Sequence, residues 1–294
     1  MTLHMYKNVS GQINDPVSPR VYLLDESGQN YETLYLLNQE LTFEVDVSNL
    51  PCGMNGAFYL TSMPADGGRN AKNPAGAAYG TGYCDAQCPK STFIAGVANE
   101  KDLGACCAEM DIWEANAAST QMTPHPCTKQ GLYQCNGTDC LNVQYGGVCD
   151  EWGCGYNPYT IQGPDYYGKS NTDITVRRTL SNIDVIGQGK NYTINTLKPF
   201  TVVTQFLTKN NQSSGMLNEI RRLYIQNGKV IQNAKESFEG ATLDSTTVDY
   251  CNATASTFED AGGFKQMTQN LAKGMVLIAS IWNDQGGNMT WLDT

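Results

Sequence analysis

Short runs of β-branched and aromatic residues recur along the chain and predict strands. Residues 41–47 (LTFEVDV) alternate apolar and polar side chains, which is the period-two pattern of a strand with one buried face. Five further runs of similar composition lie at residues 20–24, 33–37, 56–63, 199–207 and 273–282. Between two apolar segments, the pair Asn227–Gly228 predicts a tight two-residue hairpin.

Helical patterns are scarce. The clearest lies in residues 262–274, where Phe264, Met267 and Leu271 share one face and a glycine follows the last turn. Residues 118–198 are rich in Gly, Pro, Cys and Asn, which predicts long loops. Because the chain shows no internal repeat and no linker, we expect a single all-β domain built as an antiparallel sandwich.

Composition narrows the possible partners. Of the 294 residues, 16% are charged, and the net charge is −10. Phosphate binding needs a basic face, so we expect neither nucleic acid nor an anionic membrane as a partner, whereas a neutral polymer would not be repelled. No apolar run reaches the roughly 20 residues that are needed to span a bilayer.

Eleven cysteines indicate an oxidising compartment, because cytosolic proteins rarely carry so many. None of their spacings fits a zinc site, and we expect no bound metal. Acceptor sequences for N-glycosylation support secretion to the extracellular space; they start at Asn8, Asn136, Asn191, Asn211, Asn252 and Asn288. The first residues, MTLHMYKNVSGQ, do not form a signal peptide. This start and the odd cysteine count together predict that the chain is a piece of a longer secreted protein.

Three carboxylates lie close together in residues 106–117 (CCAEMDIWEANA), with no basic residue among them. On a strand, Glu109 and Asp111 point to the same face, and Glu114 would point to the other. A β-bulge between Asp111 and Glu114 would return Glu114 to the first face, and such bulges are common beside active sites. All three acids would then line one groove, as a glycosidase requires.

These acids could divide the chemistry between them. A hydrogen bond shared by Asp111 and Glu109 would let one carboxylate stay ionised as a nucleophile. Glu114, in a more apolar setting near Trp113, could keep its proton and act as the general acid. The alternative is that the acids are solvated at a strand end or paired with distant arginines.

The stretch CCAEMDIWEANA resembles the catalytic signature of family 7 glycoside hydrolases, the fungal and protist cellobiohydrolases and endoglucanases. The resemblance continues in family order through residues 50–68, 77–89, 123–127, 144–159, 200–206, 221–231 and 274–284. It implies a retaining β-1,4-glucanase on a concanavalin-like jelly roll. That fold is a sandwich of two curved antiparallel sheets with long, disulfide-stapled loops and little helix.

The resemblance also implies roles for individual residues. Glu109 matches the nucleophile, Glu114 the acid/base, and Asp111 the residue that supports the nucleophile. His125 matches a histidine near the catalytic site, which we include among the catalytic residues. Positions that match the substrate cleft are Tyr59, Tyr83, Asp85, Gln87, Gln144, Tyr145, Trp282 and Trp291. The two tryptophans among them match residues that stack on glucose units.

Five disulfides are implied by the family pattern. The pairs are Cys84–Cys107, Cys88–Cys106, Cys127–Cys149, Cys135–Cys140 and Cys154–Cys251. The first two would clamp the catalytic strand. Cys52 is left over, and its family partner would lie beyond Thr294. The resemblance therefore implies a single catalytic domain over residues 1–294 that is truncated at both ends.

Departures from the family pattern bear on the mode of action. The segment before CCAEMD is shorter than in typical cellobiohydrolases, Gln144 and Thr160 replace arginines, and the NDQGGN segment after Trp282 lacks the loop tyrosines often found there. These departures predict an open tunnel with weak product binding. Because 144–160 retains a roofing loop that endoglucanases usually lack, a cellobiohydrolase-like enzyme is favoured over an endoglucanase.

Other classes stay open as alternatives. A family 16 hydrolase has a similar acid triplet, but it fits the cysteine pattern and the tryptophan segments less well. A glycan-binding module without chemistry would not need Glu109 and Glu114 at this spacing. A truncated, non-catalytic fragment stays open, because the acids are kept while the flanks are missing. We expect cellulose, a β-1,4-glucan chain, as the partner of a monomeric enzyme that uses no cofactor.

Overall fold

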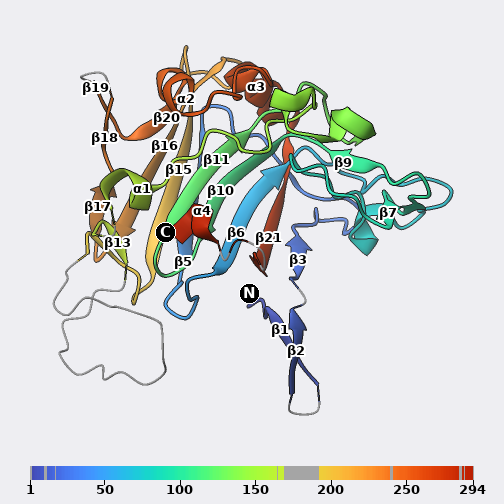
Figure 1. The fold of residues 1–294 in the computed structure, drawn as a ribbon, viewed down its shortest axis with the longest axis horizontal. Helices are drawn as coiled ribbons and strands as arrows, with labels where there is room; N and C mark the ends of the chain where they lie inside the picture. The colour runs from blue at the N-terminus through green and yellow to red at the C-terminus, as the bar shows by residue number, and fades with distance from the viewer. Residues whose placement is uncertain are drawn as a thin grey trace.

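The computed structural model describes residues 2–9, 12–16, 18–163, 165–168, 192–238, 241–284, 287 and 289–293. Two antiparallel sheets pack against each other (Figure 1). The first sheet follows the order β11-β10-β6-β21-β3, and β4 also pairs with β21. Its strands are β3 (Arg20–Tyr22), β4 (Thr33–Leu34), β6 (Met54–Thr61), β10 (Glu109–Ala115), β11 (Thr120–His125) and β21 (Met275–Asn283).

The second sheet follows the order β17-β16-β15-β5, and β20 pairs with β16. Its strands are β5 (Gln39–Val45), β15 (Phe200–Thr208), β16 (Leu217–Gln226), β17 (Lys229–Gln232) and β20 (Ser245–Thr247). The predicted hairpin joins β16 to β17, and both Asn227 and Gly228 have the positive φ that this tight turn requires. The antiparallel sandwich expected from the alternating pattern is therefore present.

Apolar side chains from both sheets fill the space between them. Leu60 and Met110 of the first sheet meet Phe206 and Ile220 of the second, and all four are fully buried. Burying such side chains is the main driving force for the sandwich. The strand β10 lies between β6 and β11, and all seven of its residues are buried.

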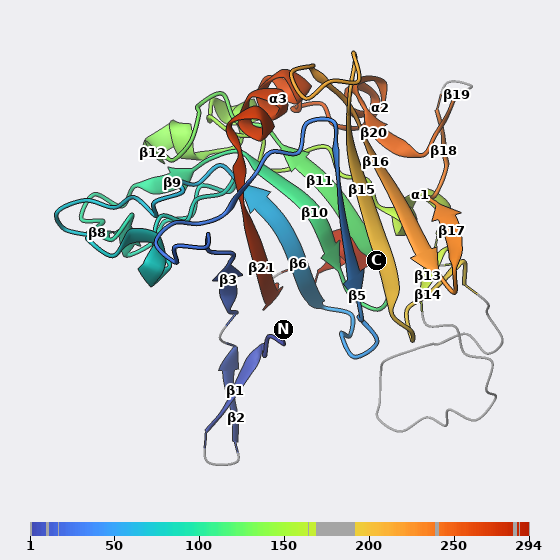
Figure 2. The same ribbon diagram turned by 180° about the vertical axis from the view of Figure 1, so that it is seen from behind.

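Helices and small hairpins surround the two sheets. The predicted helix is α3 (Gly263–Lys273), which buries Phe264, Met267 and Leu271 and ends at Gly274. Helices α2 (Val248–Thr254) and α3 lie at one end of the sheets, and an arm that contains β7 (Phe93–Ile94) and β8 (Val97–Ala98) projects to one side (Figure 2). The remaining helices are α1 (Pro158–Gln162), α2 (Val248–Thr254) and α4 (Thr290–Asp293), and the 3₁₀ helices are η1 (Gly76–Tyr79), η2 (Gly137–Cys140) and η3 (Val143–Tyr145).

The small pairs are antiparallel with one exception, the parallel pair β13–β14. Their strands are β1 (Tyr6–Val9), β2 (Gln12–Pro16), β7 (Phe93–Ile94), β8 (Val97–Ala98), β9 (Gly104–Cys106), β12 (Tyr133–Cys135), β13 (Tyr167–Gly168), β14 (Ile194–Asn195), β18 (Glu236–Phe238) and β19 (Ala241–Leu243). In the described part of the chain, no helix is both long and apolar enough to cross a bilayer.

The prediction of loops across residues 118–198 was wrong at its start, because Thr120–His125 forms the strand β11. Pro124 interrupts the strand pattern in the sequence, since proline cannot donate a ladder hydrogen bond. β11 lies at the edge of the first sheet, where one side of the strand needs no partner, so proline is tolerated there.

All five implied disulfides form. They are Cys84–Cys107, Cys88–Cys106, Cys127–Cys149, Cys135–Cys140 and Cys154–Cys251. Cys52 belongs to none of these five pairs and is exposed. Of the glycosylation acceptors, Asn136, Asn211 and Asn252 are exposed, as the modification requires. Asn191, Asn288 and the side chain of Asn8 lie outside what the structure describes.

Candidate active site

The strand β10 presents three carboxyl groups to one cavity. Its pairing with β11 shifts register between Asp111 and Glu114, and its pairing with β6 shifts between Asp111 and Trp113. Ile112 is therefore the extra residue of a β-bulge. Ile112 and Trp113 consequently both pack into the apolar core, and Glu114 returns to the face of Glu109. The predicted bulge between Asp111 and Glu114 is confirmed.

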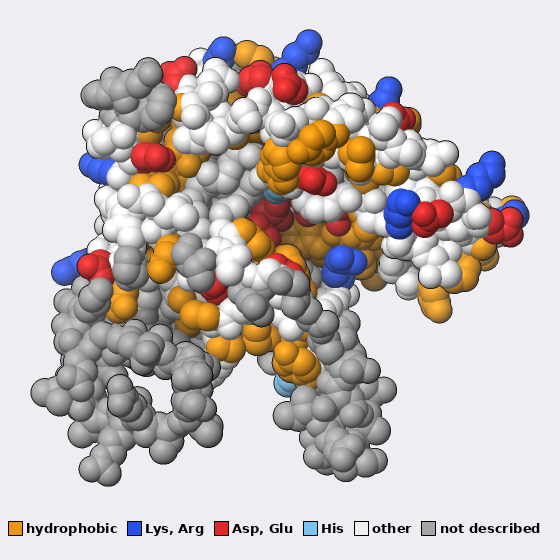
Figure 3. All heavy atoms as spheres, in the orientation of Figure 1, with side chains coloured by type: hydrophobic (Ala, Val, Ile, Leu, Met, Phe, Trp, Pro, Cys, Tyr) orange, Lys and Arg blue, Asp and Glu red, His pale blue; other side chains and the backbone are white. Residues whose placement is uncertain are grey.

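The three acids lie in a cavity of about 680 Å³, a volume typical of small-molecule sites. Figure 3 shows a hollow in the molecular surface with acidic side chains and a histidine inside it. The cavity brings together ten of the twelve residues predicted from the sequence. These are Tyr59, Tyr83, Asp85, Gln87, Glu109, Asp111, Glu114, His125, Trp282 and Trp291.

Gln144 and Tyr145 are the two predicted residues that do not line this cavity. Both lie on η3, and Tyr145 is 60% exposed. Its ring meets the edge of Trp152, with ring centres 6.5 Å apart, and Trp152 does line the cavity. The aromatic side chain that this loop gives to the cavity is thus Trp152, which the sequence argument overlooked.

Asp111 is paired with His125 from the neighbouring strand β11. Their Oδ2 and Nε2 atoms lie 2.9 Å apart, and Nδ1 of His125 lies 3.0 Å from the carbonyl oxygen of Asp150. Both partners are acceptors, so both ring nitrogens must donate, which only the imidazolium can do. Burial would lower the pKa of His125, but the hydrogen bond and charge of Asp111 outweigh it and raise this pKa to about 9. The expected hydrogen bond between Asp111 and Glu109 is replaced by this pair.

Glu114 is placed to keep its proton near neutral pH. Burial first, and then the negative charge of Asp111, raise the pKa of Glu114 to about 8. The side-chain amide of Asn55 donates to Oε1 of Glu114 at 2.8 Å, while the amide oxygen of Asn55 accepts from the N–H of Ala115. The second contact fixes the amide orientation and leaves the other carboxyl oxygen of Glu114 to carry the proton. Trp113 packs on the opposite face of the strand. It therefore does not provide the apolar setting for Glu114 that the sequence argument assigned to it.

Glu109 also lies where a charge is costly. Burial first, then the charges of Asp111 and Asp85, raise the pKa of Glu109 well above its usual range. The backbone N–H of Ala86 donates to Oε2 of Glu109 at 3.2 Å, which favours the charged form. Because several buried carboxyl groups interact here, the observed titrations will belong to the group as a whole.

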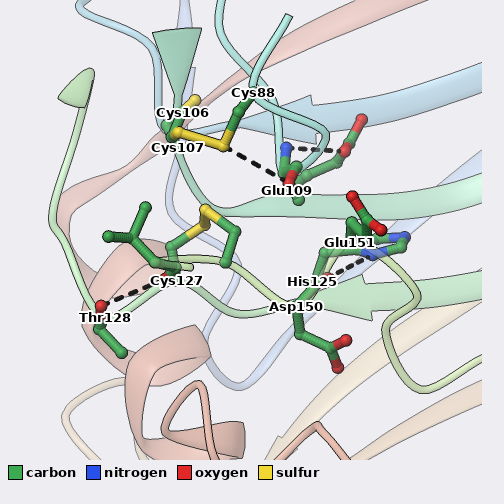
Figure 4. The surroundings of a disulfide bond; sticks show 12 residues. Cys88, Cys106, Cys107, Glu109, His125, Cys127, Thr128, Asp150 and Glu151 are labelled. Carbon is green, nitrogen blue, oxygen red and sulfur yellow. Dashed lines mark hydrogen bonds between the residues drawn. A yellow bond between two sulfur atoms is a disulfide. The ribbon is translucent and has the colours of Figure 1, made fainter. Parts of the chain in front are cut away.

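Two disulfides fix the segment that carries Ala86. Cys84 is joined to Cys107, and Cys88 is joined to Cys106, directly before the strand β10. Figure 4 shows the Cys88–Cys106 disulfide beside Glu109, with His125 on the neighbouring strand. The cysteine pair before the acids therefore holds a hydrogen-bond donor in place over Glu109, which supports the clamp implied by the resemblance.

Replacing both Cys88 and Cys106 by alanine should lower the free energy of unfolding by about 2–4 kcal/mol, because the bridge closes a loop across a sequence separation of 18. The rate of hydrolysis should also fall, since Ala86 would no longer be held over Glu109. Urea denaturation and kcat would be measured together. The matched control removes Cys135–Cys140, which spans a separation of only 5. Equal effects of the two replacements on kcat would contradict the clamp.

A chain of polar contacts lines one wall of the cavity. The hydroxyl groups of Tyr59 and Tyr83 lie 3.0 Å apart, and Tyr83 donates to Asp85 at 2.7 Å. Nε of Arg20 donates to the Tyr59 hydroxyl at 3.1 Å, and its guanidinium lies 3.8 Å from the centre of the Tyr83 ring. Arg20 was not predicted as a site residue, because it comes from β3, outside the segments that carry the family resemblance.

Another part of the cavity wall carries two stacked tryptophans. The rings of Trp282 and Trp291 lie 6.2 Å apart at an interplanar angle of 22°. Aromatic faces suit the C–H groups of a sugar ring. Trp291 remains 39% exposed, so its surface is available to a ligand in the cavity.

A cation could approach three of these side chains. One ligand atom each from Glu109, Asp111 and His125 lies within 4.8 Å of the others. Asp111 and His125 are already bonded to each other, so a metal would have to displace the proton between them. Another group, Cys88, Cys106 and Cys149, consists of sulfurs that are bound in disulfides and offer no thiolate.

The geometry fits a glycosidase, and sequence comparison decides the family. A model of glycosyl hydrolase family 7 matches residues 1–188 and 178–294. The chain belongs to this family. Among its family 7 relatives, the probable endo-beta-1,4-glucanase celB of Aspergillus terreus is 54% identical over 293 residues, which are 100% of this chain. The chain spans 64% of the length of that relative.

Solved family 7 structures share the fold. The native endocellulase EGI of Humicola insolens superposes with a TM-score of 0.83 at 45% identity, over 94% of this chain and 64% of that one. A family 7 cellobiohydrolase from Daphnia pulex gives a TM-score of 0.81 at 41% identity, over 92% and 63% of the two chains. The predicted jelly-roll sandwich is thereby confirmed.

Proposed function

We propose that the protein hydrolyses internal β-1,4-glucosidic bonds of cellulose and retains the anomeric configuration. The observation that carries the proposal is the bulge in β10, which gathers Glu109, Asp111 and Glu114 in one cavity. A retaining glycosidase needs two carboxyl groups with different roles beside a single bond. A binding module would have no use for this costly cluster of buried acids.

In the proposed mechanism, the carboxylate of Glu109 attacks the anomeric carbon while Glu114 gives its proton to the departing glycosidic oxygen. Water then cleaves the glycosyl ester on Glu109, and Glu114 takes the proton from that water. Asp111 lies beside the reacting centre and accepts a hydrogen bond from Nε2 of His125. Neither step needs a metal or an organic cofactor.

The endo mode replaces the cellobiohydrolase-like mode that the sequence favoured. The Aspergillus terreus relative bears an endoglucanase name, and the Humicola insolens neighbour is an endocellulase. Gln144, which stands where many cellobiohydrolases have an arginine that grips product, and Thr160, which replaces another arginine of the family pattern, also favour weak product binding. Gln144 does not line the cavity, to which the same loop contributes Glu151 and Trp152.

The setting of the proposed activity is extracellular, which the five disulfides support. The partner is a single β-1,4-glucan chain laid in the cavity against Trp282 and Trp291. A monomeric enzyme without nucleic-acid or membrane partners stays a prediction from charge and composition.

The function is tested on two substrates. On soluble β-1,4-oligoglucosides, NMR of the fresh product should show the β-anomer first. On carboxymethylcellulose, viscosity should fall early relative to the number of reducing ends, because internal cuts shorten chains quickly. Release of cellobiose with little loss of viscosity would restore the cellobiohydrolase mode. An α-anomeric product would exclude the retaining mechanism, and no cleavage would leave a glycan-binding protein.

A further inference from the structure

The largest fully buried side chain in the described structure is an arginine between the two sheets. Arg222 lies on β16 and is 2% exposed. Among the residues that the structure describes, no carboxylate lies within ion-pair distance of it. Burying an unpaired guanidinium costs free energy. We therefore expect the groups that Arg222 does contact to offset this cost.

Two of those groups belong to the bulge of the strand β10. Nη2 of Arg222 donates to the carbonyl oxygen of Ile112, and Nε donates to the hydroxyl of Thr204 at 3.1 Å. The guanidinium also lies 5.5 Å from the centre of the Trp113 ring, within cation–π distance. Two consecutive bulge residues, Ile112 and Trp113, are therefore held by one side chain from the opposite sheet.

A bulge leaves its extra residue outside the regular ladder of backbone hydrogen bonds. The carbonyl group of Ile112 faces the core, where an unsatisfied oxygen would destabilise this backbone conformation. The hydrogen bond from Arg222 satisfies that oxygen only while the bulge is present. A regular strand would turn Trp113 toward the cavity and Glu114 toward the core.

We propose that Arg222 is a positioning residue that maintains the bulge and thereby aims Glu114 at the leaving-group oxygen. It acts from the core, since it is not among the residues that line the cavity. The inference rests on the proposed function, because it assigns Glu114 the task of protonating the leaving group.

The decisive variant is Arg222→Met, which removes the charge and both hydrogen bonds at similar volume. Buried ionic groups often tolerate such apolar replacement without loss of stability. On aryl β-cellobiosides whose phenols have a high pKa, kcat/KM, which reports formation of the glycosyl ester, should fall about 100-fold, as for a misplacement of about 1 Å. On cellobiosides of strongly acidic phenols the loss of kcat/KM should be several-fold smaller, because their departure needs little proton transfer.

Two matched variants separate positioning from general damage. Ile220→Val changes the same strand and the same core but leaves the hydrogen bond from Arg222 to the bulge in place, so its rate loss should not depend on the phenol. Arg222→Lys keeps the charge but not the two-point contact, and a smaller loss with the same dependence on the phenol is expected. It also serves if the methionine variant does not fold, which thermal unfolding will show.

The dependence of the rate loss on the leaving group tests whether Arg222 positions Glu114. A folded methionine variant that loses rate equally on all phenols, or loses none, would overturn the proposal, as would a lysine variant with no such dependence. The unchanged protein is assayed on the same series. If it cleaves no member of the series, the proposed function fails, independently of Arg222.

Discussion

Replacing Glu109 by glutamine should lower kcat on β-1,4-oligoglucosides by about 10⁵–10⁶-fold, the scale seen when a covalent nucleophile is removed. An amide has nearly the same shape as the carboxyl group, but it cannot form the glycosyl ester. Glu109 is only 5% exposed and accepts a hydrogen bond from the N–H of Ala86, which the amide oxygen can also accept. The fold and the affinity for the glucan chain should therefore be retained. Discontinuous assays of product release would give kcat, and isothermal titration calorimetry would give the affinity for the glucan chain.

The matched control for this variant is Glu44→Gln, the same substitution at an exposed position of β5 in the other sheet. Its rate should equal that of the unchanged protein. If Glu109→Gln instead keeps the full rate, Glu109 is not the nucleophile. Loss of glucan binding together with activity would indicate that Glu109 serves affinity more than chemistry.

Local patterns in the sequence predicted the parts of the fold that local interactions determine. The hairpin at Asn227–Gly228 follows from residues that tolerate positive φ, and α3 follows from apolar spacing over a few turns. The edge strand β11 was missed because Pro124 weakens its pattern. Only the sheet order, which the local sequence does not contain, reveals that β11 lies at an edge.

The grouping of the three acids could be predicted because all three come from one strand. The bulge could be predicted without knowledge of the partner strands, because Glu114 must share a face with Glu109. The residues around the three acids were harder to predict, because they come from distant segments of the chain. Arg20 lies on β3, Asn55 on β6 and Trp152 in a loop, and no local motif connects them.

The contacts of Arg222 in the core could not be predicted from the local sequence either. In the run EIRRLYIQ, alternation indicates that one of the two adjacent arginines faces inward, but not what it meets there. Arg221 is partly exposed and bonds to Glu219 at 2.8 Å, as an ordinary surface pair would. The partner of Arg222 is a backbone carbonyl 110 positions away, created by an irregularity in another strand.

Glu114→Gln should lower kcat on β-1,4-oligoglucosides by about 10²–10⁴-fold, the usual contribution of a general acid. The pKa of Glu114, raised to about 8, means that the group is protonated below that pH and loses its proton as the pH rises through it. In the unchanged protein, the basic limb of kcat/KM should therefore have an apparent pKa near 8. The amide of the variant cannot titrate, so this limb should be absent from the residual kcat/KM of Glu114→Gln on the same oligoglucosides.

A cellobioside of an acidic phenol separates the two roles of Glu114. Its phenol leaves without a proton, so formation of the glycosyl ester should be nearly normal, whereas attack by water should be slow for want of a base. Azide needs no base, and adding it should raise the turnover of Glu114→Gln but not that of Glu109→Gln. If azide has no effect and the basic limb persists in Glu114→Gln, another residue supplies the proton. The hydrogen bond from Asn55 and the bulge at Ile112 would then position Glu114 for binding alone.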